Sequence, residues 1–114
     1  MLIFSGNTVK WTAPEGQNIV KVINKSPSRF AIKIKSSDVE TYTTCPVYDI
    51  IEADHTLNLV VVRKKAPMKD DKISISYLEC EADDTDAAAV FKKPNLTPNV
   101  YIVTMKCITT STER

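Results

Sequence analysis

The chain has 114 residues and a mass of 12.7 kDa, enough for one hydrophobic core and too little for two. Hydrophobic residues make up 43% and charged residues 25% of the sequence, a globular composition that argues against disorder. Fifteen basic and fourteen acidic side chains leave a formal charge of +1, so we expect no nucleic-acid partner held by bulk charge. We expect a single domain over residues 1–114.

The residues that several kinds of site require are scarce. Gly6 and Gly16 are the only glycines, which excludes glycine-rich phosphate loops and dinucleotide-binding fingerprints. His55 is the only histidine, which leaves little material for a multi-histidine metal site or a histidine proton relay. We therefore expect no metal and no cofactor.

The cysteines and the hydrophobic runs bear on localisation. Cys45, Cys80 and Cys107 are odd in number and form no CxxC pair, which favours free thiols in a cytoplasmic protein. No histidine is placed by sequence to activate Cys45, so a half-buried structural thiol is favoured over a nucleophile there. No run approaches the roughly 20 apolar residues of a membrane span, and the first residues lack a signal-peptide pattern.

Over most of the chain the hydrophobic pattern repeats every two residues, which predicts β-strands with one buried and one exposed face. Proline, glycine, serine and asparagine fill the gaps and predict turns. In chain order the predicted strands are Leu2–Phe4, Val9–Thr12, Val20–Ile23, Phe30–Lys35, Val39–Cys45, Leu57–Val62, Lys72–Tyr77 and Val100–Thr109.

Seven or eight short strands at this spacing predict an all-β, antiparallel β-sandwich. Both alternating positions of Leu57–Val62 are apolar apart from Asn58, which predicts a more buried strand there. Trp11 is expected in the core. The other expected core residues are Phe30, Ile32, Ile34, Leu57, Leu59, Val61, Ile73 and Ile75.

Residues 83–93 break the strand pattern, with acids first, alanines in the middle and lysines last. This order predicts a short helical turn capped by Thr85 or Asp86, and Pro94 ends it. The polar tail after Thr109 is expected to be frayed.

No catalytic motif emerges from the acidic and histidine residues. His55 follows Asp54, but adjacent strand residues point to opposite faces, which favours an exposed histidine over a base and its orienting acid. Asp83, Asp84 and Asp86 lack the spacing of a calcium loop. A solvated acidic loop that caps a helix is the favoured interpretation, and we expect no enzymatic activity.

Several segments resemble, in order, the major sperm protein (MSP) domain, and the resemblance runs from residue 2 to about residue 109. The chain is similar in brevity to the small sperm-specific MSP-domain proteins of nematodes, and more distantly to the MSP domain of the VAP proteins. The segments that carry the resemblance are Trp11–Pro14, Val20–Pro27, Phe30–Ser37, Pro46–Glu52, Leu57–Val62 and Asp71–Ile75.

The resemblance implies an immunoglobulin-like sandwich without enzymatic activity that works through protein contacts. Filament-forming members of the family drive the crawling motility of nematode sperm. One hypothesis is therefore a cytoplasmic protein of the sperm cytoskeleton that associates with itself, as in a homodimer, or with other MSP-domain proteins. The alternative is a module that binds short acidic, phenylalanine-containing (FFAT-like) peptides, as the membrane-tethered VAP relatives do.

The predicted strands Phe30–Lys35 and Lys72–Tyr77 should be antiparallel neighbours in an immunoglobulin-like sandwich. Their outward lysines would then converge at one end of the sheet. The resemblance points to the same place, because these positions match the peptide-contacting Lys-Thr-Thr run of the tethered relatives and the strand facing it. The candidate protein- or peptide-binding residues are Lys33, Lys35, Ser36, Ser37, Lys72 and Ser74.

The surroundings of this candidate face also follow from the alternation. Val100 and Ile102 should point outward beside the lysines, and apolar area rimmed by charge is typical of an interaction surface. Asp38 and Glu40 replace positive charge of the tethered relatives and would oppose an acidic ligand. The competing interpretation is that these lysines are merely solvated and prevent edge-to-edge aggregation.

Overall fold

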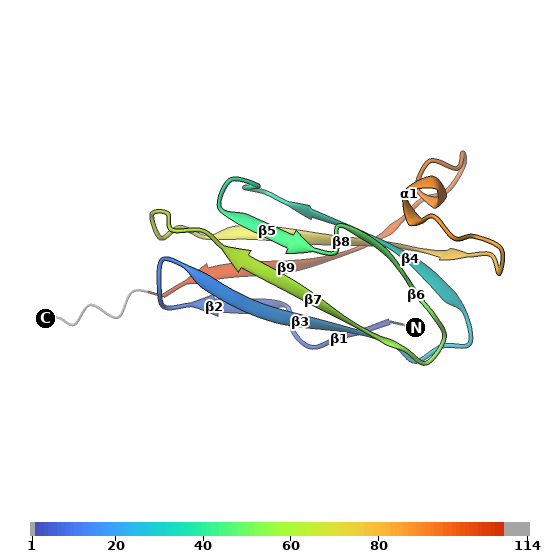
Figure 1. The fold of residues 1–114 in the computed structure, drawn as a ribbon, viewed down its shortest axis with the longest axis horizontal. Coiled ribbons are helices and arrows are strands. Elements are labelled where there is room, and N and C mark those ends of the chain that lie inside the picture. Colours follow the sequence, from blue (N-terminus) through green and yellow to red (C-terminus); the bar gives the residue numbers. More distant parts are fainter. Residues whose placement is uncertain (1, 109–114) are drawn as a thin grey trace, which may run out of the picture.

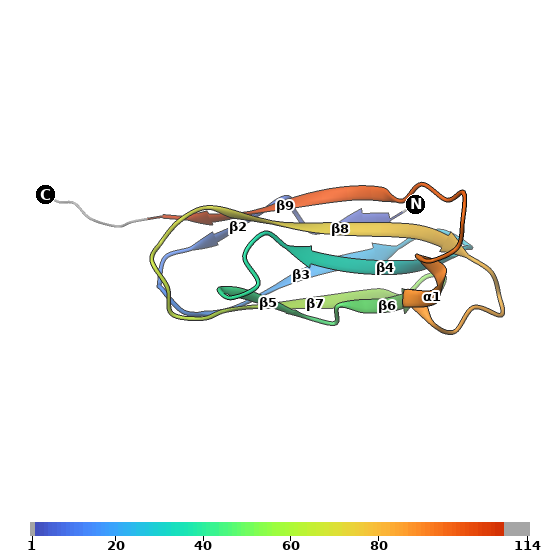
Figure 2. The ribbon, with the colours of Figure 1, turned by 90° about the horizontal axis from the view of Figure 1, so that it is seen from above.

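The structure, a computed structural model, describes residues 2–108. In this part of the chain, nine strands and one short helix form two sheets that pack face to face (Figures 1 and 2). The elements are β1 (Leu2–Phe4), β2 (Thr8–Trp11), β3 (Gly16–Asn24), β4 (Arg29–Ser36), β5 (Tyr42–Cys45), β6 (Tyr48–Ile51), β7 (Thr56–Arg63), β8 (Asp71–Cys80), α1 (Ala87–Val90) and β9 (Asn99–Cys107).

One sheet has the strand order β1-β3-β7-β5, and the other has the order β2-β9-β8-β4-β6. Strands β4 and β8 are antiparallel neighbours, as expected. The predicted immunoglobulin-like β-sandwich is thus confirmed, with one departure from an all-antiparallel arrangement. Strand β2 is the exception: the chain crosses from the edge of the first sheet at β1 to the edge of the second at β2, where it pairs in parallel with β9.

The predicted strands differ from the structure in several details. β3 begins at Gly16 instead of Val20, and β8 runs to Cys80 instead of Tyr77. Strand β6 adds a ninth strand that the alternation did not reveal, because its consecutive Ile50 and Ile51 break the period of two: Ile51 lies in the main core and Ile50 packs against the small core under α1. The strand expected from Val39 begins only at Tyr42, since residues 38–41 form a turn in which the Asp38 carbonyl accepts the Thr41 and Tyr42 N–H groups. Thr109, where the last strand was expected to end, and the polar tail lie outside the described residues.

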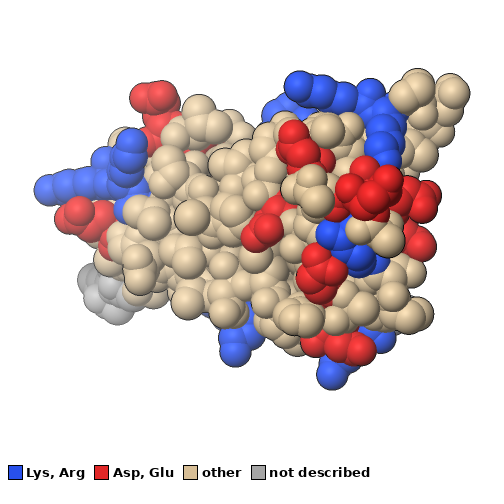
Figure 3. All heavy atoms as spheres, turned by 45° about the vertical axis from the view of Figure 1, so that its right-hand side comes forward, with Lys and Arg blue, Asp and Glu red and all other residues tan. Residues whose placement is uncertain are grey.

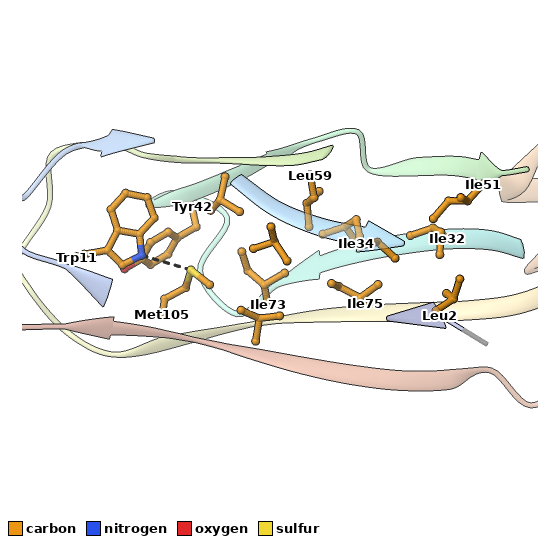
Figure 4. Packing of buried hydrophobic residues seen from close by; sticks show 14 residues of the cluster. Leu2, Trp11, Ile32, Ile34, Tyr42, Ile51, Leu59, Ile73, Ile75 and Met105 are labelled. Atoms are coloured by element: carbon orange, nitrogen blue, oxygen red, sulfur yellow. Dashed lines mark hydrogen bonds between the residues drawn. The ribbon is translucent and has the colours of Figure 1, made fainter. Parts of the chain in front are cut away.

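The core fills the space between the two sheets (Figure 4). Of the eight expected residues, Phe30 and Leu57 are half-buried at its margin and the other six are buried. Trp11 is buried too, and its indole N–H donates to Met105 Sδ at 3.4 Å. The stronger burial expected for Leu57–Val62 is wrong on the outer side, where Val62 is 38% exposed because no element within residues 2–108 packs over that face of the first sheet.

A buried arginine at the end of β7 fixes the connection to β8. The Arg63 guanidinium donates to the Tyr42 hydroxyl at 2.8 Å and to the Ala66 and Pro67 carbonyls at 2.9 Å. It also lies over the Tyr42 ring, 5.1 Å from the centroid, a favourable cation–π geometry. Burial raises the pKa of Tyr42 above its ordinary value. These contacts hold residues 64–70 in place just before β8 begins.

Helix α1 covers one end of the second sheet's outer face. Asp86 caps it by accepting the Ala88 N–H at 3.1 Å, which confirms one of the two predicted capping residues. Ala87 and Val90 pack with Ala31 of β4 and Leu78 of β8 in a small second core. The rest of that face, toward the start of β8, is not covered by the helix.

Candidate functional site

The candidate residues of β4 and β8 come together as the alternation predicted. Lys35 lies opposite Ser74 in the strand register, and Ser36 lies opposite Ile73. The Ser37 N–H donates to the Lys72 carbonyl at 2.9 Å, so Lys72 lies beside the residue that follows the last one of β4. Both Lys35 and Lys72 are exposed and belong to none of the ion pairs formed within residues 2–108.

The two serines at the rim hold the backbone rather than point freely into solvent. Ser37 Oγ accepts the Lys72 N–H and donates to Asp71 Oδ1, both at 2.9 Å. Ser36 Oγ accepts the Asp38 N–H at 3.2 Å. The end of β4 and the start of β8 are therefore fixed to each other, and the rim is formed before any partner arrives.

These residues line an open depression of about 260 Å³. We call it the lysine groove. Lys33 is the one candidate residue outside its lining, because it lies two residues back along β4, opposite Ser76. The residues of the lysine groove are Lys35, Ser36, Ser37, Lys72 and Ser74.

An apolar strip flanks the lysine groove on β9. In the register of β8 and β9, Ile102 lies opposite Ser74 and Val100 lies opposite Ser76. Val100 is 57% and Ile102 44% exposed, as predicted. Large apolar side chains exposed beside unpaired lysines are the composition that interaction surfaces show.

The acids expected to oppose an acidic ligand differ in their surroundings. Asp38 is half-buried and accepts the Thr41 hydroxyl at 2.8 Å, and its carboxylate pairs with Lys69 at 3.2 Å. The hydrogen bond from Thr41 and then the Lys69 ammonium lower the pKa of Asp38. Lys69 also pairs with Asp71 at 2.7 Å. The charge of Asp38 is thus compensated, and only Glu40 of the two acids stands exposed.

A second depression, which sequence reasoning missed, adjoins the lysine groove through Ser36. It has a volume of about 230 Å³ and is mainly apolar, with Ile34 and Tyr42 among its lining residues and the exposed Val39 and Val47 beside them. It forms where the chain crosses from β4 to the first sheet as β5 and then returns to the edge of β4 as β6, beginning with the Ile34 N–H···O Val47 bond of 2.8 Å. The only signal in the sequence was the pair of valines Val39 and Val47, one in each of the connections on either side of β5.

The other residues weighed as sites have structural roles. Asp84 pairs with Lys93 at 2.9 Å, and Asp86 caps α1. His55 is exposed at the start of β7, as predicted, with Nδ1 2.8 Å from the Ala53 carbonyl oxygen. Within residues 2–108 no three His, Cys, Asp or Glu side chains are grouped as a metal site would require. No helix in this part of the chain is long and apolar enough to cross a membrane.

The fold and the groove define an immunoglobulin-like β-sandwich with a preformed basic surface beside exposed apolar residues. Residues 2–99 match the family model of the MSP (major sperm protein) domain. The chain therefore belongs to the MSP-domain family.

Known relatives agree with this assignment. Sperm-specific class P protein 32 of Caenorhabditis elegans is 38% identical over 92 residues, which cover 81% of this chain and 86% of that protein. The solved structure of WR4, a C. elegans MSP family member, superimposes with a TM-score of 0.86 at 33% identity and covers 95% of this chain and 98% of WR4. SSP-19, an MSP-domain-like protein of C. elegans, shares the fold with a TM-score of 0.83 at 24% identity, covering 91% of this chain and 96% of SSP-19.

Proposed function

We propose that this chain is a non-enzymatic interaction protein of the MSP-based motility system of nematode sperm. It acts in the cytoplasm as a single domain over residues 1–114, by associating with itself or with other MSP-domain proteins. The sperm-specific relatives support the setting, and the family supports the kind of activity.

The observation that carries the proposal is the lysine groove. Lys35 and Lys72 present two uncompensated positive charges at one end of a rigid sheet face, and Ile102 lies beside them. The lysines would steer an acidic partner surface toward the groove, and Val100 and Ile102 would supply apolar area to be buried on contact.

The test is the double variant Lys35→Glu with Lys72→Glu. Association with itself or with a filament-forming MSP subunit, measured by sedimentation velocity, should be weakened by about a hundredfold, because like charges then meet at the contact. The parent's association should also weaken as salt rises. Lys10→Glu with Lys64→Glu is the control, since it makes the same change of net charge at exposed lysines outside the groove.

Two results would contradict the proposal. Unchanged association of the double variant would move the contact away from the lysine groove. A parent that stays monomeric, ignores MSP subunits and captures an acidic FFAT-like peptide would instead favour the peptide-binding alternative.

A further inference from the structure

The end of the molecule that carries α1 bears a dense run of acidic side chains. Residues 79–86 contain five acids and no basic residue, and Figure 3 shows acidic side chains gathered over this end. Asp84 is paired with Lys93, and Asp86 caps α1. Glu81 and Asp83 are exposed and belong to no ion pair formed within residues 2–108.

Glu81 and Asp83 lie on a tight turn over residues 81–84, which we call the acidic turn. The Asp84 N–H donates to the Glu81 carbonyl at 3.2 Å, and the Glu81 N–H donates to Asp84 Oδ2 at 2.7 Å. Lys93 Nζ donates to both Asp84 carboxylate oxygens at 2.9 Å and ties the turn to the residues after α1. A turn fixed in this way loses little conformational entropy when it binds.

The acidic turn and the lysine groove lie at opposite ends of β8. Lys72 is the second residue of that strand, and the turn follows Cys80, its last residue. Eight residues of extended strand span about 27 Å, so the turn cannot fold back into the groove of its own chain. Figures 1 and 2 both place the connection from β8 to α1 at the end of the molecule away from the connection between β7 and β8.

We propose that the acidic turn of one copy docks into the lysine groove of another copy, so that copies associate head to tail. This extends the proposed function, since it names the partner of the groove as a second copy of this chain. The Glu81 and Asp83 carboxylates would meet two ammonium groups on the other copy, and none of these four groups forms an ion pair within residues 2–108. Ala82 between the carboxylates is small enough for the turn to approach the sheet. The serines fix the groove and Lys93 fixes the turn, so neither surface needs to rearrange.

The contact joins two different surfaces, so each added copy leaves one free groove and one free turn. Such a heterologous contact generates rings if the rotation closes and open chains if it does not. A two-fold dimer through the lysine groove alone would instead bring lysine against lysine and would not need the acidic turn.

The experiment uses charge reversal on each surface and on both. The groove variant is Lys35→Glu with Lys72→Glu, the turn variant is Glu81→Lys with Asp83→Lys, and the fourfold variant carries all four changes. Glu15→Lys with Asp54→Lys is the control for net charge, because both side chains are exposed and lie outside the turn and outside the lysine groove. Far-ultraviolet circular dichroism checks that every variant is folded, and sedimentation velocity at low salt measures association.

We expect the groove variant and the turn variant each to weaken self-association about a hundredfold, while the control associates like the parent. An equimolar mixture of the two variants should associate again, and so should the fourfold variant, because opposite charges face each other in both cases.

Three results would overturn the head-to-tail contact. A turn variant that associates like the parent, beside a groove variant that does not, refutes the acidic turn as the partner and leaves the proposed function of the groove standing. A mixture that fails to associate also refutes it. A parent that is monomeric at every concentration refutes it too, and binding to other MSP subunits then decides the proposed function separately.

Discussion

The side chains that hold the two sheets together are spread over both of them. Ile32 of β4 and Leu59 of β7 come from opposite sheets, and both are fully buried. Because each is surrounded by core neighbours, truncation removes buried methyl groups and leaves a cavity.

Replacing Ile32 or Leu59 by alanine should therefore lower the free energy of unfolding by about 2–5 kcal/mol. Urea unfolding followed by circular dichroism measures the change. Ile19→Ala is the matched control, because that side chain is 53% exposed on the outer face of β3 and should cost well under half as much. Near-neutral results at both core sites would exclude the sandwich core described above.

The cysteines give a second prediction for single residues. All three are free thiols, with Cys45 exposed and Cys80 and Cys107 half-buried. Burial raises the pKa of Cys80, and the Cys107 thiol donates to the Lys69 carbonyl at 3.1 Å, so both should react slowly while the protein is folded.

Alkylation without reductant, read by mass spectrometry, should modify Cys45 first in the folded protein and all three cysteines after unfolding. Fewer than three modified cysteines in the unfolded chain would reveal a disulfide and would argue against a cytoplasmic setting.

Between strands, the turn that links β4 to β5 is the element that most directly supports the lysine groove. Asp38 closes this turn through Thr41 and ties it to Lys69 of the connection between β7 and β8. Asp71 binds both Lys69 and the rim residue Ser37. The acids near the groove therefore shape it, and their charge is compensated locally by Lys69.

This arrangement predicts a pH dependence. The pKa of Asp38 is lower in the folded chain than in the unfolded one, so its contribution to stability is fully present above the unfolded value of about 4. It is lost as the pH falls through the lower folded value. Asp38→Asn should be less stable than the parent at neutral pH and should lose less stability on acidification.

Urea unfolding at a series of pH values down to strong acid measures this difference. Glu40→Gln is the control from the same turn, because Glu40 is exposed, and it should follow the parent at every pH. A parallel acid loss in the parent and in Asp38→Asn would contradict the role given to Asp38.

These elements also show which features of the structure could be predicted from the sequence and which could not. A period of two fixes which side chains face inward, so the core, the outward lysines and the outward Val100 and Ile102 could all be predicted. Strand β6 does not alternate, because Ile50 and Ile51 each pack against a different core. This is why β6 and the apolar depression beside it were missed. Arg63 was missed as a core residue, because its burial depends on the Tyr42 ring and on carbonyl groups that only the folded chain brings near.

Two surfaces of the molecule are candidates for self-association. The lysine groove combines uncompensated charge with flanking apolar residues. The outer face of the first sheet is uncovered as well, and there Ile19 and Val62 stand 53% and 38% exposed. We assign association to the groove, because within residues 2–108 its unpaired Lys35 and Lys72 have a complementary surface, the acidic turn, on the same chain.

The most direct test is a dilution series followed by amide signals in heteronuclear NMR spectra of the parent at low salt. As concentration rises, we expect shifts at Lys35, Ser37, Lys72 and Ser74 that shrink when salt is added, with little change at Ile19 or Val62. Shifts that instead centre on Ile19 and Val62 and are insensitive to salt would contradict this expectation.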